Sequence, residues 1–343
     1  MSKILIINTG GTISMTASRR GYVPDGAAFR AQLEGMDLLK AQPMPQWDLI
    51  ETEPLLDSSN MSVSDWNRIG GMVADHYGSY DGFVILHGTD TMAYTASALS
   101  FMLEGLDKPV ILTGSQIPLA EIRSDGRTNL IESMLIAAEG RAREVCIFFG
   151  GKLLRGNRAT KYSADELIAF VSPNYPPLAE TGISVEYNES AFLKRERKPF
   201  RLQVLEEIPI GVIKVFPGIQ FSLFDQIMTE KLKGIVIETF GAGNIPNGGS
   251  ELLPIVRKAM EHGTVLAVCS QCPQGTVSLG AYEASSALAE AGAVSGRDLT
   301  TEAAVAKLYY LFSKGYSAEK VKKLMETPIC GEEKEKQHRR SRR

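Results

Sequence analysis

The chain has 343 residues, with 37 Lys and Arg against 40 Asp and Glu, so its formal net charge is −3. At roughly 100–200 residues per domain this length predicts about two domains, and 44% hydrophobic with 22% charged residues is typical of a folded globular protein. The near-neutral balance gives little reason to expect nucleic acid as a partner, and no apolar run approaches the roughly 20 residues of a membrane span, so we expect no membrane.

The first 180 residues alternate between strand and helix patterns. Short apolar runs, partly β-branched, are typical of buried strands and occupy residues 4–7, 82–86, 109–112 and 145–149. We predict helices between them: one opened by a capping box of Ser62 and Asp65, one over residues 91–103 and one over residues 130–142. This alternation predicts an α/β fold with a doubly wound parallel sheet. The run at 4–7 is too short for a signal-peptide core, so we expect a cytoplasmic protein.

The composition changes near residue 187, where charged residues replace the apolar runs. We predict a larger N-terminal catalytic domain over residues 1–186, a solvated linker over 187–210, a smaller C-terminal α/β domain over 211–330 and a disordered charged tail over 331–343. In the C-terminal domain we expect strands at residues 211–216, 234–238 and 264–268, and helices near 251–261, 301–312 and 318–325.

Cysteine and histidine give no metal or redox site. Cys269 and Cys272 have the spacing of a redox pair, but Pro273 and Gly275 indicate a loop, whereas a reactive first cysteine would open a helix. A reduced cysteine at a strand end is the favoured interpretation. The chain has only four histidines and no histidine–carboxylate motif, so we expect neither a metal nor any other cofactor.

Two glycine turns present hydroxyl groups at strand ends. Gly10-Gly11-Thr12 follows the first strand without the spacing of a dinucleotide or phosphate loop. Taken alone, Thr12 is more often a turn residue than a nucleophile. After the strand at 82–86 come Gly88, Thr89 and Asp90; Asp90 or Thr91 could simply cap the following helix. Because ligands bind at the carboxyl ends of parallel strands, the two turns together favour an acyl-transfer site.

A hydroxyl nucleophile needs a base, and Lys161 is the candidate. The nearby Arg155 and Arg158 would disfavour a proton on Lys161, although a surface cation is the alternative. Short polar side chains at Asp57-Ser58-Ser59 suit a loop that holds a carboxylate; an ordinary turn is the simpler interpretation of that loop alone.

These motifs, in this order and spacing, resemble those of the bacterial-type L-asparaginases, most of all the cytoplasmic type I branch. The matching segments are residues 9–13, 57–61, 87–91 and 155–161, and the resemblance covers essentially the whole chain except its basic end. It implies hydrolysis of L-asparagine to L-aspartate and ammonia through an acyl-enzyme.

The resemblance also implies residue roles. Thr12 would attack the amide carbon, assisted by Tyr22 on a segment that Gly21 and Gly26 allow to close as a lid. Thr89, Asp90 and Lys161 would form a second triad, and which threonine attacks first has been argued over; we favour Thr12. Substrate binding would fall to Asp90 and to Gly11, Asp57, Ser58 and Ser59, with backbone N–H groups near Gly11 and Thr89 stabilising the oxyanion.

In the C-terminal half, Asn244 matches an asparagine that completes a neighbouring subunit's site in the family, which implies a homodimer or homotetramer. On sequence alone a structural turn at Asn244 is equally acceptable. Some type I relatives have a second asparagine site with an arginine ahead of this turn and a cysteine nearby; Cys272 is present, but residues 238–240 contain no arginine. Allosteric activation by asparagine is therefore not expected.

Three alternatives remain. The first is a glutaminase–asparaginase of broader specificity. Glutamine has one methylene more than asparagine, and an enzyme discriminates a single methylene by only about 1–3 kcal/mol. Amidotransferase subunits for tRNA charging carry an extra N-terminal domain, for which the position of Thr9 leaves no room. A non-catalytic amino-acid sensor would not need Thr12, Thr89, Asp90 and Lys161 together.

Overall fold

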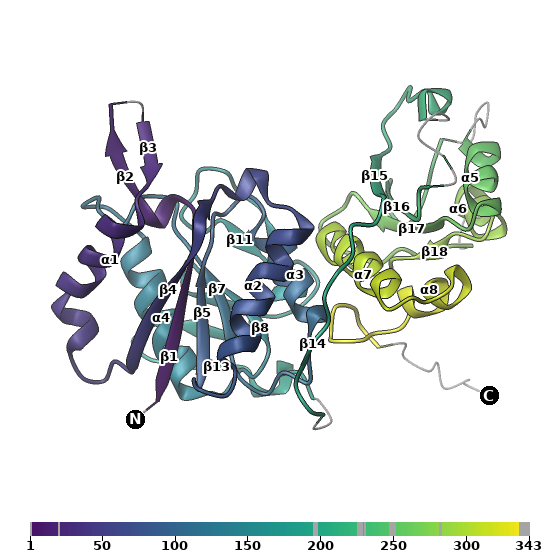
Figure 1. Ribbon diagram of the computed structural model, residues 1–343. Helices are drawn as coiled ribbons and strands as arrows, with labels where there is room; N and C mark the ends of the chain where they lie inside the picture. The colour runs from purple at the N-terminus through teal and green to yellow at the C-terminus, as the bar shows by residue number, and fades with distance from the viewer. Residues whose placement is uncertain are drawn as a thin grey trace. The chain divides into compact units, whose positions relative to one another are not determined.

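The structure is a computed structural model that describes residues 2–19, 21–194, 198–224, 229, 231–246, 252–280 and 283–335. The chain divides into two compact units, Met1–Leu205 and Glu206–Arg343 (Figure 1). No helix in the described part is long and apolar enough to span a membrane.

A mixed, mainly parallel sheet forms the centre of the first unit, and its described strands number eight. The parallel strands, in spatial order, are β4 (Gln46–Leu56), β1 (Lys3–Gly10), β5 (Gly82–Leu86), β7 (Val110–Thr113) and β8 (Val145–Phe149). Three antiparallel strands continue the sheet beyond β8: β9 (Lys152–Arg155), β12 (Ala179–Thr181) and β13 (Val185–Tyr187). The four strands expected in this half are confirmed, whereas β4, at the edge of the sheet, was not predicted.

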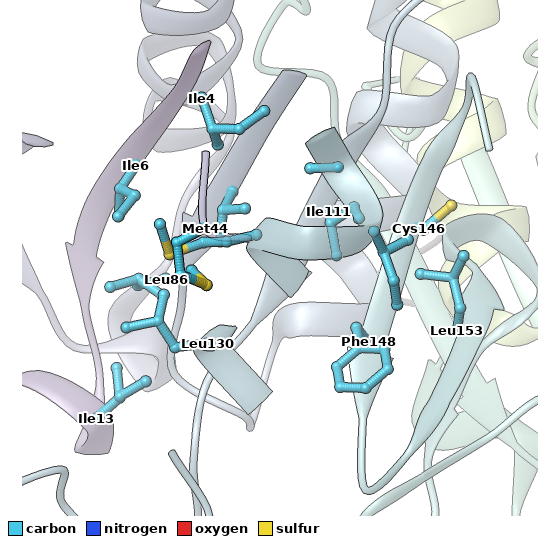
Figure 2. Close-up of a cluster of buried hydrophobic side chains, with 14 of the residues drawn as sticks. Ile4, Ile6, Ile13, Met44, Leu86, Ile111, Leu130, Cys146, Phe148 and Leu153 are labelled. Atoms are coloured by element: carbon cyan, nitrogen blue, oxygen red, sulfur yellow. The ribbon is translucent and has the colours of Figure 1, made fainter. Parts of the chain in front are cut away.

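Helices cover both faces of this sheet, as the fold class predicted. They are α1 (Gly26–Gly35), α2 (Val63–His76), α3 (Met92–Met102) and α4 (Gly126–Glu139). The α4 and α1 side chains Leu130 and Phe29 pack with Ile4 and Ile6 of β1 in one buried cluster, part of which Figure 2 shows. On the other face, α3 contacts β7 and β8, and α2 packs on α3 (Figure 1).

Helix ends follow local chemistry. The capping box of α2 is confirmed, since the backbone N–H of Ser62 donates to the Asp65 carboxylate at 2.9 Å. The helix expected over 130–142 instead ends at Glu139, because Gly140 adopts the left-handed conformation (φ 67°) that terminates helices.

Three small two-stranded sheets complete the first unit. They pair β2 (Met15–Ser18) with β3 (Gly21–Pro24), β10 (Thr160–Lys161) with β11 (Phe170–Val171), and β6 (Leu103–Glu104) with β14 (Arg201–Leu202). The first of these is a hairpin that lies between β1 and α1 in the chain.

The second unit contains a smaller parallel sheet, in the order β15 (Ile210–Lys214), β16 (Gly234–Thr239), β17 (Val265–Ser270) and β18 (Val294–Ser295). Its described helices are α5 (Leu252–Glu261), α6 (Glu283–Glu290), α7 (Thr301–Ser313) and α8 (Ala318–Met325). The expected strands and helices of this half are confirmed, except that residue 251 lies outside the described residues and α6 was not predicted.

Cys269 and Cys272 are free thiols, and burial raises the pKa of Cys269, on β17, to about 12, as expected for an unreactive cysteine.

The linker expected over residues 187–210 is contradicted at residues 201–205, and its residues 195–197 lie outside the described residues. Arg201 and Leu202 pair with β6, and the side-chain amide of Asn67 binds both the C=O and the N–H of Leu205, at 2.7 and 2.8 Å. The next residue, Glu206, donates its N–H to the Ser313 hydroxyl of the second unit at 2.8 Å. Hydrogen bonds to Asn67 and Ser313 therefore hold the end of the segment that was expected to be a solvated linker.

The disordered tail expected over residues 331–343 is wrong for 331–335; residues 336–343 lie outside the described residues. The carboxylates of Glu332 and Glu333 lie 2.7 and 2.9 Å from the Lys307 ammonium group, and all three side chains are fully buried. Lys307 also donates to the C=O of Met325 and Thr327, and Arg297 pairs with Glu333 at 2.9 Å. These charges hold the segment inside the second unit because each is compensated there.

Candidate active site

The site is assembled where the strand order of the first sheet reverses. From β1 the chain goes first to β4 on one side and later to β5 on the other. In open α/β sheets this topological switch point creates a crevice at the carboxyl ends of the strands, where ligands bind. Thr12 follows β1 and Thr89 follows β5, so both predicted hydroxyls lie at this point.

The two glycine turns are in direct backbone contact. Gly11 has φ 83°, and a Cβ built on it would lie only 2.5 Å from Cα of Gly88. A side chain at position 11 would therefore separate the turns. This contact places Thr12 and Thr89, each one residue beyond the touching glycines, in adjoining loops. The half-buried Thr12 opens a short 3₁₀ turn, Thr12–Ser14.

Thr89, Asp90 and Lys161 form one hydrogen-bonded group. The Lys161 ammonium donates to Oγ1 of Thr89 at 2.9 Å and pairs with Oδ1 of Asp90 at 2.6 Å. Thr89 is 8% exposed, whereas the Asp90 side chain is 62% exposed, so solvent reaches the acid but hardly the hydroxyl. The surface-cation alternative for Lys161 is wrong. The helix-capping alternative is also wrong, because Asp90 pairs with Lys161 and the Thr91 hydroxyl donates to the C=O of Ser58 at 2.8 Å.

Sequence reasoning missed Gln116. Its side-chain Oε1 accepts a 3.2 Å hydrogen bond from the Thr89 hydroxyl, and its Nε2 donates to the C=O of Ala164 and Glu166 at 3.1 and 3.2 Å. Gln116 therefore connects Thr89 with the loop that follows Lys161. It comes soon after the strand predicted at 109–112, so the strand-end rule that singled out Thr12 and Thr89 would have found it.

The Asp57-Ser58-Ser59 loop adjoins the second glycine turn. A Cβ on Gly88 would lie 2.7 Å from Cβ of the buried Ser58, while Asp57 and Ser59 are exposed. The Asp57 carboxylate accepts the N–H of Ser59 at 3.0 Å, which shapes the turn. Ser58 thus lies against the same turn as Thr89, and Asp57 and Ser59 flank it in an exposed loop.

Tyr22 lies on the hairpin, half exposed, and its hydroxyl donates to the Glu121 carboxylate at 3.0 Å. That hydrogen bond is the main reason that the pKa of Tyr22 is raised above its usual value. Among the described residues no hydrogen bond joins Tyr22 to Thr12. For these two described residues, the structure therefore shows no hydrogen bond between the predicted assistant and the predicted nucleophile.

Arg155, the arginine expected to lie near Lys161, pairs with Glu144. Its guanidinium is buried against the Glu144 carboxylate at 2.5 Å and donates to the C=O of Ala191 at 2.8 Å. Its charge is therefore compensated by Glu144, while Lys161 pairs with Asp90.

His87 is fully buried and its ring contacts the backbone of the Gly88 turn. Its Nδ1 contacts the C=O of Gly88 at 2.7 Å, which requires a proton on Nδ1, and its Nε2 accepts from the Thr95 hydroxyl at 2.9 Å. The Trp66 indole N–H donates to the same hydroxyl at 3.1 Å. Burial lowers the pKa of His87 to about 4, so the ring is neutral at pH 7 and orients the turn.

Asn244 lies in a tight turn of the second unit, where its backbone N–H and C=O both pair with Phe240 at 2.9 Å. Its side-chain Oδ1 is buried and has no hydrogen-bond partner in the described structure.

Comparison with known proteins agrees with this architecture. Residues 3–193 match the family model described as "Asparaginase, N-terminal", and residues 209–325 match "Glutaminase/Asparaginase C-terminal domain". The chain belongs to the asparaginase family.

Individual relatives resemble this asparaginase over nearly its full length. It is 43% identical to L-asparaginase 1 of Escherichia coli (strain K12) over 96% of this chain and 97% of that one. The crystal structure of L-asparaginase I from Vibrio cholerae O1 biovar eltor str. N16961 matches with a TM-score of 0.90 at 44% identity, over 97% and 99% of the two chains. The structure of the "Probable Cytoplasmic L-asparaginase" from Campylobacter jejuni matches with a TM-score of 0.78 at 25% identity, over 95% and 99%.

Proposed function

We propose that this asparaginase hydrolyses L-asparagine to L-aspartate and ammonia through an acyl-enzyme on Thr12. The observation that carries the proposal is the Thr89–Lys161 hydrogen bond of 2.9 Å, beside the backbone contact between Gly11 and Gly88. The names of the similar proteins support the same reaction. A threonine hydroxyl, a lysine and a carboxylate in adjoining loops are suited to acyl transfer without a metal.

In the first half-reaction the Thr12 oxygen attacks the side-chain amide carbon of asparagine. Its proton passes, through Tyr22 once the hairpin closes, to the departing nitrogen, which leaves as ammonia. Backbone N–H groups near Gly11 and Thr89 stabilise the negative oxygen of the tetrahedral intermediate. In the second half-reaction Thr89, polarised by Lys161, orients the water that hydrolyses the ester and releases aspartate.

Free asparagine carries an ammonium and a carboxylate on one carbon, and the polar groups near Thr89 fit both. Asp90 would bind the ammonium group, while Asp57, Ser58 and Ser59 would bind the α-amino and α-carboxylate ends. Binding of these remote groups positions the reacting amide. A truncated amide such as propionamide should therefore lose turnover as well as affinity.

We also propose that the active assembly is a homodimer or homotetramer in the cytoplasm. The match of Asn244 to the asparagine that completes a neighbouring subunit's site in the family supports this assembly. The printed name of the Campylobacter jejuni relative supports the location. Light scattering at several protein concentrations gives the subunit number.

Ammonia release from asparagine and glutamine, measured side by side over a concentration range, tests the activity. Asparagine turnover with little glutamine turnover supports the proposal, comparable rates identify a broader glutaminase–asparaginase, and no turnover identifies a sensor. The glutaminase alternative stays open because the second family model covers both enzymes.

The nucleophile needs its own test. We expect Thr12→Ala to abolish transfer of the aspartyl group to hydroxylamine, whereas Thr12→Ser, which keeps a hydroxyl, retains part of it. Asp90→Ala should instead raise KM, because Asp90 binds the substrate ammonium. Near-normal turnover by purified Thr12→Ala would show that the acyl group is carried elsewhere.

A further inference from the structure

The side chain of Asn8, at the end of β1, supports the turn that carries Thr12. Asn8 is fully buried, and its Oδ1 accepts the N–H of Gly10 at 3.0 Å. Its Nδ2 donates to Oε1 of Glu51, on β4, at 2.7 Å. The two partners determine the amide orientation, since a backbone N–H can only donate and a carboxylate accepts.

Gly10 is the last residue of β1, directly before the turn, and has φ 112°. A Cβ there would lie 3.0 Å from the Leu56 backbone nitrogen, so the turn fits closely against the end of β4. Its N–H bond to Asn8 is the side-chain contact that sets the direction in which the chain leaves β1, two residues before Thr12.

Glu51 also contacts the point at which the hairpin returns to the body of the unit. A Cβ on Gly26, the first residue of α1, would lie 2.9 Å from Oε1 of Glu51, so the carboxylate occupies the space that the missing side chain leaves. Oε2 of Glu51 lies 3.7 Å from the Arg30 guanidinium. Asp25, the cap of this helix, donates its N–H to the C=O of Ser14 at 3.2 Å. The two ends of the hairpin that carries Tyr22 are thus joined beside Glu51.

We propose that Asn8 and Glu51 are positioning residues for the reaction. The Glu51 carboxylate orients the Asn8 amide, the amide holds Gly10, and Gly10 sets the place of Thr12. The same carboxylate anchors the hairpin at Gly26. This inference rests on the proposed role of Thr12 as nucleophile.

A charge swap tests the pair. Asn8→Asp places two carboxylates in contact, so we expect kcat for asparagine to fall by about tenfold or more while KM changes less. Adding Glu51→Gln makes an amide face the new carboxylate, which still accepts the N–H of Gly10. We expect the double variant to recover kcat to within about threefold of the native enzyme. Because the exchange also relieves any loss of stability, kcat and KM are compared only among variants whose thermal melts show them folded.

Asn67→Asp, the same change in the amide that binds Leu205, is the matched control and should leave kcat unchanged. If Asn8→Asp does not fold, Asn8→Ala, which removes the acceptor of the Gly10 N–H without adding charge, should show the same loss of kcat. Native-like kcat in a folded Asn8→Asp or Asn8→Ala, or a double variant no better than Asn8→Asp, would overturn the inference. Thr12→Ala, assayed in parallel by transfer to hydroxylamine, separates the two failures: if it stays active, the proposed nucleophile is wrong, whatever the Asn8 variants do.

Discussion

Lys161 donates a hydrogen bond of 2.9 Å to Thr89, although 72 positions separate them in the chain. Lys161 lies on β10, which pairs with β11, so its backbone is held while its side chain reaches Thr89 and Asp90. The tertiary structure therefore determines which hydroxyl accepts the hydrogen bond of Lys161.

We expect Lys161→Met to lower kcat by about 10²–10⁴-fold, the range of a general acid–base group. Met keeps most of the aliphatic length, so the fold should survive, as a thermal melt will show. Lys161→Arg is the charge-matched control and should recover little, because a planar guanidinium cannot replace a single ammonium donor between two acceptors. An active Lys161→Met would remove the lysine from the mechanism.

The hydrogen bond between Tyr22 and Glu121 predicts a titration shift. A carboxylate beside a phenol favours the protonated phenol, so the pKa of Tyr22 is raised. Glu121→Gln removes that charge, and we expect Tyr22 to ionise at lower pH. The measurement is the alkaline absorbance titration of each protein minus that of its Tyr22→Phe counterpart. Identical Tyr22 midpoints with and without Glu121 would show that the contact does not persist in solution.

His87 predicts how stability depends on acid. Its pKa is lowered to about 4 in the folded protein, against about 6.5 in an unfolded chain. Between these values the unfolded chain binds a proton that the folded protein does not, so the free energy of unfolding falls as pH falls, by up to about 1.4 kcal/mol per pH unit from this residue. His87→Gln should be less stable at pH 7 but show a shallower loss between pH 6.5 and 4 in urea unfolding. Parallel curves for the two proteins would contradict the prediction.

The buried charges at the end of the second unit predict a large stability effect. Lys307→Met leaves Glu332 and Glu333 buried without their ammonium partner, which should cost about 3–5 kcal/mol in the free energy of unfolding. Changing both glutamates to Gln in the same protein should restore part of that loss, because the uncompensated charge disappears. Urea unfolding of the full chain measures the loss in Lys307→Met and its partial recovery in the triple variant. An unchanged urea midpoint for Lys307→Met would mean that solvent reaches these carboxylates.

The sequence predicted those elements whose signal is local. The strands at 82–86 and 145–149 are entirely apolar, as fully buried parallel strands are, and the Ser62–Asp65 box lies within four residues. By contrast β4 is an edge strand with many exposed and half-buried positions. Its polar residues interrupt the apolar run that would have predicted a strand. The segments 198–205 and 331–335 looked solvated because their partners, Asn67 and Lys307, lie far away along the chain.

For the site, the strand-end rule predicted the loops but not their contacts. Thr12, Thr89, Asp90 and Lys161 were predicted to share one locality, and Thr89, Asp90 and Lys161 are hydrogen-bonded together. The contact between Gly11 and Gly88 has no local sequence signal, because it depends on two strands that only the folded sheet brings together. Gln116 follows a predicted strand, so its position could be predicted, but its hydrogen bond to Thr89 could not. The attachment of Tyr22 to Glu121, 99 positions away, is of the same kind.

Asn67 secures Leu205 to the first unit and Ser313 secures Glu206 to the second, so adjacent residues belong to different halves. A gene recombined with that of a relative should therefore be spliced between these two codons. A crossover a few residues earlier would take Leu205 from one parent and Asn67, which binds its backbone, from the other.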